Sequence, residues 1–89
     1  MYKVTFSKEA LEELLKIRKS MPQAYKKFEK IIGELEQHPY SGTGKPEPLR
    51  GLPQIWSRRI DKKNRLRYTV DEDIVTVFVI STLGHYDDK

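Results

Sequence analysis

The apolar residues change their spacing part-way along the chain, and this change limits the folds that the sequence can form. Between residues 10 and 35 they recur every three or four positions, which is the spacing of an amphipathic helix. After residue 54 apolar and polar residues mostly alternate, as in strands with one buried face. Helices followed by strands indicate an α+β fold, with two N-terminal helices packed on one face of a small antiparallel sheet.

The N-terminal part predicts a short strand and a helical hairpin. Tyr2–Phe6 alternates and precedes Ser7, a residue type that commonly caps the start of a helix. After a short break Pro22 starts a second helix, because the N–H that proline lacks has no partner in the first turn. The stripes expected to face the sheet are Ala10, Leu11, Leu14, Leu15 and Arg18 in the first helix, and Phe28, Ile31, Ile32 and Leu35 in the second.

The C-terminal part predicts a long loop and three strands. Residues 39–53 are rich in glycine and proline, so we expect a loop without regular structure, and loops this long in small domains are usually functional. Short turns connect the segments that follow and imply an antiparallel meander of Ile55–Ile60, Arg65–Val70 and Ile74–Ser81. The last of these is apolar on both faces, so we expect a central strand, with the N-terminal strand pairing elsewhere in the sheet.

Positive charge is concentrated in one segment of the chain. The 89 residues have a formal net charge of +4, but residues 45–67 alone contain 8 basic and 2 acidic residues, a net charge of +6. A concentration of this kind is typical of a surface that binds a polyanion.

Length and composition exclude several other kinds of protein. A chain of this size is expected to form a single domain, residues 1–89. It contains 2 histidines and no cysteine, which excludes a disulfide framework and argues against a metal site. No stretch approaches the ~20 apolar residues of a membrane span, so we expect a cytoplasmic protein without a membrane partner. A chain this short cannot contain a large cofactor-binding fold, so no cofactor is expected.

Two of the predicted strands bring arginines to the sheet. Alternation places Arg65 and Arg67 on one face, and it directs Arg58 and Arg59 to opposite faces of the preceding strand. One arginine from each strand can therefore share the helix-free face, where guanidinium groups suit phosphate. An ordinary solvated β face fits the same pattern.

Three further residues have the chemistry for RNA cleavage. Glu47 lies between two prolines beside Lys45, either as a partner of that lysine or as an acid–base group. A histidine side chain such as that of His85 can in general give or take a proton near neutral pH, although a lone histidine is often only a surface residue. Tyr86 suits either an anchor for the C-terminus or a surface on which a base stacks. Glutamate, arginine and histidine can deprotonate a 2′-hydroxyl, stabilise a phosphorane and protonate a leaving oxygen without a metal ion.

Four ordered motifs resemble the YoeB/Txe toxins of the RelE-like superfamily. They are Gly42-Thr43-Gly44-Lys45-Pro46-Glu47-Pro48-Leu49, Trp56-Ser57-Arg58-Arg59-Ile60, Arg65-Leu66-Arg67-Tyr68 and His85-Tyr86. The resemblance covers most of the chain and implies a microbial-RNase-like core, and often a homodimer. It also implies an endoribonuclease that cuts mRNA in the ribosomal A site, inhibits translation and is held inactive by a YefM-like antitoxin.

The same resemblance implies roles for individual residues. Glu47 looks like the general base, Arg65 the phosphate stabiliser, His85 the general acid and Tyr86 a substrate-positioning or catalytic residue. The basic residues expected to contact RNA are Lys45, Arg50, Arg58, Arg59 and Arg67.

Two other functions remain open from the sequence. The first is a noncatalytic module that binds RNA or the ribosome through its arginines. The second is a degenerate toxin that acts as an antitoxin-binding co-repressor. It is suggested by Asp87-Asp88-Lys89, which follow the His-Tyr pair at which the family pattern generally ends.

Overall fold

The computed structural model describes residues 1–73 and 76–81, which form two helices and a five-stranded sheet. In chain order the elements are β1 (Lys3–Phe6), α1 (Lys8–Ser20), α2 (Pro22–Leu35), β2 (Glu47–Leu49), β3 (Leu52–Arg59), β4 (Arg65–Asp71) and β5 (Thr76–Ser81). The strand order across the sheet is β1-β5-β4-β3-β2. The predicted α+β class is confirmed.

The sheet contains the predicted meander and one parallel pair. β3, β4 and β5 are antiparallel neighbours, and β5 is a central strand because β1 pairs with its other side. β1 runs parallel to β5, so the sheet is mixed at this edge instead of purely antiparallel. Parallel neighbours need a long connection, which here includes both helices and the strands β2 to β4.

The segment predicted as an irregular loop, residues 39–53, contains part of the sheet. β2 and β3 form a hairpin in which Pro48 lies opposite Trp56, and β3 begins at Leu52 instead of the predicted Ile55. β2 is an edge strand, where proline is tolerated because only one side of the strand needs partners. The prolines and glycines therefore shorten the strand without abolishing it.

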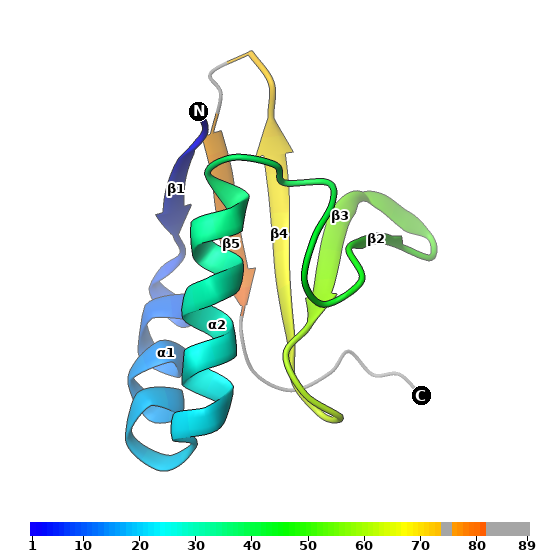
Figure 1. Cartoon of the computed structure of the whole chain (residues 1–89). Coiled ribbons are helices and arrows are strands. Elements are labelled where there is room, and N and C mark those ends of the chain that lie inside the picture. The colour runs from blue at the N-terminus through cyan, green and yellow to red at the C-terminus, as the bar shows by residue number, and fades with distance from the viewer. Residues whose placement is uncertain (74–75, 82–89) are drawn as a thin grey trace.

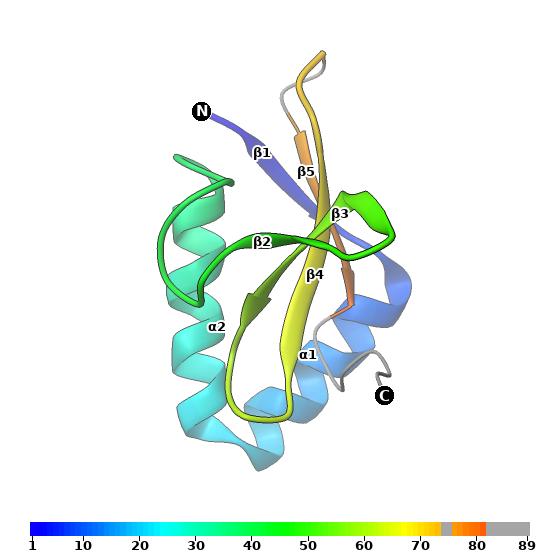
Figure 2. The same ribbon diagram turned by 90° about the vertical axis from the view of Figure 1, so that its right-hand side faces the viewer.

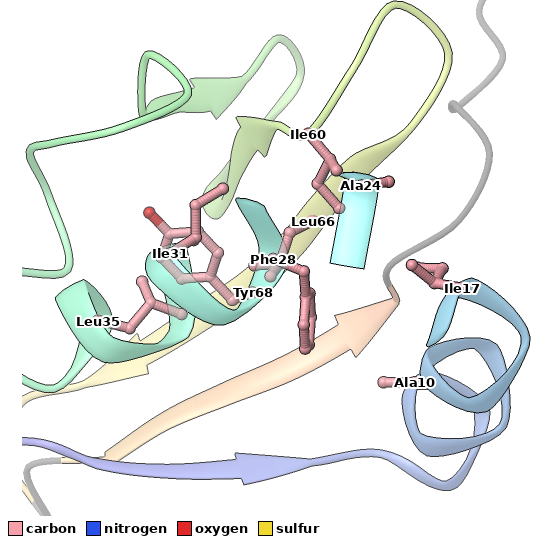
Figure 3. Close-up of a cluster of buried hydrophobic side chains, with 9 residues drawn as sticks. All are labelled: Ala10, Ile17, Ala24, Phe28, Ile31, Leu35, Ile60, Leu66 and Tyr68. Carbon is pink, nitrogen blue, oxygen red and sulfur yellow. The ribbon is translucent and has the colours of Figure 1, made fainter. Parts of the chain in front are cut away.

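The hydrophobic core lies between the helices and β4. In Figure 1, α2 lies in front of the sheet with α1 beside it. Figure 3 shows Phe28 and Ile31 of α2 close to Leu66 and Tyr68 of β4. The buried hydrophobic side chains among the described residues are Ala10, Ile17, Ala24, Phe28, Ile31, Leu35, Ile60, Leu66 and Tyr68.

The buried face of α1 differs from the predicted stripe. Ser7 caps the helix as predicted, and its hydroxyl oxygen accepts a hydrogen bond from the Ala10 N–H at 2.9 Å. Ala10 and Ile17 are fully buried, whereas Leu11 and Leu15 are 49% and 64% exposed. Successive helical residues are about 100° apart, so a face centred on Ala10 and Ile17 turns the two leucines away from the core.

Candidate nucleic-acid interface

Three strands bring one carboxylate and three arginines to the face of the sheet opposite the core. Glu47 of β2 lies opposite Ser57 of β3, which lies opposite Arg67 of β4. Two residues farther along β3, Arg59 lies opposite Arg65. Directly opposed residues point to the same side of a sheet, and alternate residues of one strand do too. These four charged residues therefore share one side, which we call the charged face.

The side chains of the charged face differ in exposure. Glu47 and Arg59 are exposed and Arg65 is half-buried. Arg67 is only 5% exposed, so little of its guanidinium is open to a ligand. The burial of Arg67 argues against the predicted RNA contact, whereas the other three side chains are accessible.

A tight turn places Lys45 beside the charged face. The Arg59 N–H donates a hydrogen bond of 2.7 Å to the Gly44 carbonyl. Gly44 has φ +85°, and a Cβ atom there would lie 2.6 Å from the Arg59 carbonyl oxygen, so only glycine fits. Lys45 follows with φ 52° and an exposed side chain. The turn joins two motifs that are separate in the sequence.

Arg50 lies in the turn between β2 and β3 and is exposed. The next residue, Gly51, has φ +82°, which is the left-handed conformation that tight hairpin turns require. Arg50 is therefore accessible to a polyanion at the end of the hairpin that carries Glu47.

His85 and Tyr86, the predicted general acid and its neighbour, lie outside the described residues, as does the acidic end of the chain. The last described residue, Ser81, lies opposite Arg67 in the pairing of β5 with β4. The described part of β5 thus ends next to a residue of the charged face, four positions before His85 in the sequence.

Arg58 has a structural role instead of the predicted contact with RNA. Its side chain is 0% exposed and lies on the core side of β3. Its Nη1 forms an ion pair of 2.7 Å with Oε1 of Glu34 in α2, and its Nε donates to the Tyr68 hydroxyl at 3.2 Å. The guanidinium is enclosed and has partners within the protein, so it is not accessible to RNA. The structure therefore argues against the predicted RNA contact of Arg58.

Glu34 accepts hydrogen bonds from two residues. The Thr43 N–H donates to it at 2.8 Å and the Thr43 hydroxyl at 2.6 Å, in addition to the bond from Arg58. Burial alone would raise the pKa of Glu34, but the hydrogen bonds from Thr43 and Arg58 outweigh burial and hold the pKa below its ordinary value of 4.5. The folded protein therefore favours the ionised carboxylate.

We expect acid to destabilise the protein partly through Glu34. The pKa of Glu34 is lower in the folded than in the unfolded state. Its contribution to the free energy of unfolding is therefore present above about pH 4.5, and it is lost as the pH falls through the pKa of the folded state. Denaturant unfolding of the wild type and of Glu34→Gln should show a weaker acid dependence in the variant. Asp61 and Glu72, whose pKa values are also lowered, are present in both proteins. Identical acid dependence of the two proteins would contradict the expectation.

The partners of Arg58 were missed from the sequence. Glu34 is 24 residues away in the chain and appears only as a polar residue beside the apolar stripe of its helix. Tyr68 appears only as a core aromatic residue of its strand. No local pattern relates these residues to Arg58, because their contact depends on how α2 packs against the sheet.

The charged face offers carboxylate and guanidinium groups, which can accept a proton and bind phosphate. Within residues 1–73 and 76–81, no three His, Cys, Asp or Glu side chains are grouped so that they could hold a metal ion. The helices of this part of the chain are too short or too polar to cross a membrane.

A sequence profile for the "YoeB-like toxin of bacterial type II toxin-antitoxin system" matches residues 6–86. The chain belongs to this family. Toxin YoeB of Mycobacterium bovis is 41% identical over 78 residues, which cover 86% of this chain and 92% of the relative. The YoeB dimer from Staphylococcus aureus has a TM-score of 0.83 at 31% identity, covering 96% and 98% of the two chains. The YoeB-YefM complex from the same species has a TM-score of 0.79 at 31% identity, covering 97% and 99%.

Membership of the YoeB-like toxins confirms the resemblance predicted from the four motifs, and the fold is RelE-like. The match extends from the end of β1 to Tyr86 and so includes all the motifs. The sheet brings residues of three different motifs to one face, namely Glu47, Arg59 and Arg65.

Proposed function

We propose that this member of the YoeB-like toxins is an mRNA endoribonuclease that acts on the ribosome and inhibits translation. The observation that carries the proposal is the charged face, where the exposed carboxylate of Glu47 lies on the same side as Arg59 and Arg65. Arginines bind phosphate, whereas a carboxylate repels it. A carboxylate among phosphate-binding groups is therefore better explained by proton transfer than by affinity.

The proposed reaction is a transesterification by acid–base catalysis without a metal ion. Glu47 takes the proton of an RNA 2′-hydroxyl, and the 2′-oxygen attacks the neighbouring phosphorus. Arg65 stabilises the additional negative charge on the phosphorane. His85 gives a proton to the 5′-oxygen as its bond to phosphorus breaks, which leaves a 2′,3′-cyclic phosphate and a free 5′-hydroxyl. Tyr86 positions the substrate.

The exposed basic residues Lys45, Arg50 and Arg59 hold the RNA backbone in this proposal. They lie in the turn before β2, in the turn between β2 and β3, and at the end of β3. Their side chains can neutralise phosphates of mRNA in the ribosomal A site. Because each neutralised phosphate releases counterions, binding should weaken as the salt concentration rises.

The S. aureus relatives suggest the protein partners. They were solved as a YoeB dimer and as a YoeB-YefM complex. We therefore propose that a YefM-like antitoxin inactivates this chain in the cytoplasm and that the chain can form a homodimer. An antitoxin with an acidic binding segment would complement the net charge of +6 in residues 45–67.

Cleavage of mRNA on translating ribosomes tests the proposed function. We expect the protein to produce cuts in phase with the codons, and His85→Ala to reduce them to background because the leaving oxygen loses its proton donor. Primer extension on ribosome-bound mRNA measures both results, and circular dichroism checks that the variant is folded. Normal cleavage by folded His85→Ala would exclude His85 as the acid.

The same experiment separates the other two functions. Salt-sensitive ribosome binding by the wild type without any cleavage would identify a noncatalytic binding module. Cleavage that appears only after removal of residues 87–89 would identify a degenerate toxin. In that case the acidic end of the chain would keep the toxin inactive.

A further inference from the structure

Arg58 directs all five N–H groups of its guanidinium to acceptors inside the protein. Two of them bind Glu34 and Tyr68. The other three bind carbonyl oxygens in the segment between α2 and β2, namely those of His38 at 2.9 Å, Ser41 at 2.8 Å and Thr43 at 3.5 Å. A lysine has three donors on one nitrogen and cannot reproduce this planar arrangement. The geometry is therefore specific for arginine.

Residues 38–44, which we call the clamped loop, are also held by other side chains. Glu34 binds both the N–H and the hydroxyl of Thr43, and the Tyr68 hydroxyl donates to the Pro39 carbonyl at 2.6 Å. Gly42 has φ +122°, and a Cβ atom there would lie 2.4 Å from Oε1 of Glu34. Figure 2 shows this segment running back along α2 before it turns into β2. The loop is thus fastened to both the helix and the sheet.

The clamped loop leads directly into the charged face. Its last residue, Gly44, accepts the hydrogen bond from the Arg59 N–H, and Lys45 and Glu47 follow within three residues. Arg58 and Arg59 are therefore adjacent in β3 but act on different sides of the sheet. Arg58 holds the loop from the core side, and Arg59 presents its guanidinium on the charged face.

We propose that Glu34 and Arg58 are positioning residues for RNA cleavage, which fix the clamped loop and through it the location of Glu47. This inference rests on the proposed function, in which Glu47 is the general base. Displacement of a reacting group by about 1 Å can slow a reaction by about 100-fold. The loop has no helix or strand of its own, so Glu34 and Arg58 hold in place the segment from which the chain enters β2 and Glu47.

The Glu34→Gln variant tests the inference with little change in shape. Glutamine keeps one acceptor oxygen but loses the charge and the second acceptor for Thr43 and Arg58. We expect a roughly tenfold lower single-turnover rate at saturating ribosomes, with the apparent Kd changed by less than about twofold, because Arg59 and Arg65 still bind phosphate. The control is Glu29→Gln, an exposed carboxylate of the same helix, which should behave as the wild type.

A double-mutant cycle separates positioning from a general loss of folded protein. If Glu34 acts through Glu47, Glu34→Gln should slow the already slow Glu47→Ala variant by less than about twofold. The same tenfold loss in both backgrounds would overturn the inference. Arg58→Lys keeps the charge and supplies a second, independent variant for the same comparison.

The exchange rates of backbone amide hydrogens report the order of the clamped loop without any need for RNA cleavage. In Glu34→Gln we expect at least about tenfold faster exchange of the Thr43 and Arg59 amides, with unchanged exchange in the middle of β4. Unchanged exchange of those two amides would overturn the inference even if the protein is an active nuclease. A wild-type chain that leaves ribosome-bound mRNA intact would instead overturn the proposed function, and the exchange rates would still show whether Glu34 holds the loop.

Discussion

Replacing Glu47 by glutamine is expected to slow cleavage of ribosome-bound mRNA by roughly 10²–10⁴-fold, the usual contribution of a general base. Glutamine has nearly the same size as glutamate but cannot take up the 2′-hydroxyl proton. Glu47 is exposed on the edge strand β2, so the free energy of unfolding should change by less than about 0.5 kcal/mol. Single-turnover rates at saturating ribosomes and thermal unfolding of the same samples measure the two quantities.

The binding constant distinguishes a general base from a phosphate contact. Because a carboxylate repels phosphate, Glu47→Gln should bind ribosomes as tightly as the wild type or more tightly. Glu12→Gln, an exposed carboxylate on α1, is the matched control and should leave both rate and affinity unchanged. Cleavage at the wild-type rate by folded Glu47→Gln would remove Glu47 from the mechanism.

The second large effect is on stability, and it concerns Arg58. We expect Arg58→Ala to lower the free energy of unfolding by about 3–5 kcal/mol, because removal of one partner leaves the other charge of a buried pair uncompensated. Glu34 is 18% exposed and can regain some hydration, so the loss should lie near the lower end of this range. The total free energy of unfolding of a small domain is about 5–15 kcal/mol. The variant should therefore unfold at a much lower denaturant concentration than the wild type.

The neighbouring arginine provides the control for this prediction. Arg59→Ala should change the free energy of unfolding by less than about 0.5 kcal/mol, because the Arg59 side chain is exposed. The same substitution should weaken ribosome binding. The slope of the logarithm of the binding constant against the logarithm of the salt concentration should become shallower by about 1, as expected for one lost phosphate contact. A larger loss of stability in Arg59→Ala than in Arg58→Ala would mean that the two faces of β3 are assigned the wrong way round.

Local patterns were sufficient to predict most of the secondary structure. The cap at Ser7 and the start of α2 at Pro22 depend on near neighbours in the chain. The strands β3 to β5 could be predicted from their β-branched and aromatic residues and from the short turns between them. β2 was not predicted, because three residues around Pro48 carry little strand signal and an edge strand is stabilised by its single neighbour. The buried face of α1 was also misplaced, because several apolar residues lie on adjacent sides of that helix.

Residue alternation also predicted part of the candidate site. It placed Arg65 and Arg67 on one side of β4 and separated Arg58 from Arg59, and the strand pairing bears out this arrangement. The sequence shows no difference between Arg58 and Arg59 that would tell a buried arginine from an exposed one. It likewise contains no sign that Arg67 is almost completely covered.

The sequence by itself determined the α+β class, the concentration of positive charge in residues 45–67 and the membership of the YoeB-like toxins, because each depends on residue type and order along the chain. Only the tertiary structure decided that Glu47, Arg59 and Arg65 share one face and that Arg58 is paired with Glu34. Those relations join a helix, a loop and three strands. They are set by how α2 packs on the sheet and by the register of β2, and neither is encoded in any short segment of the chain.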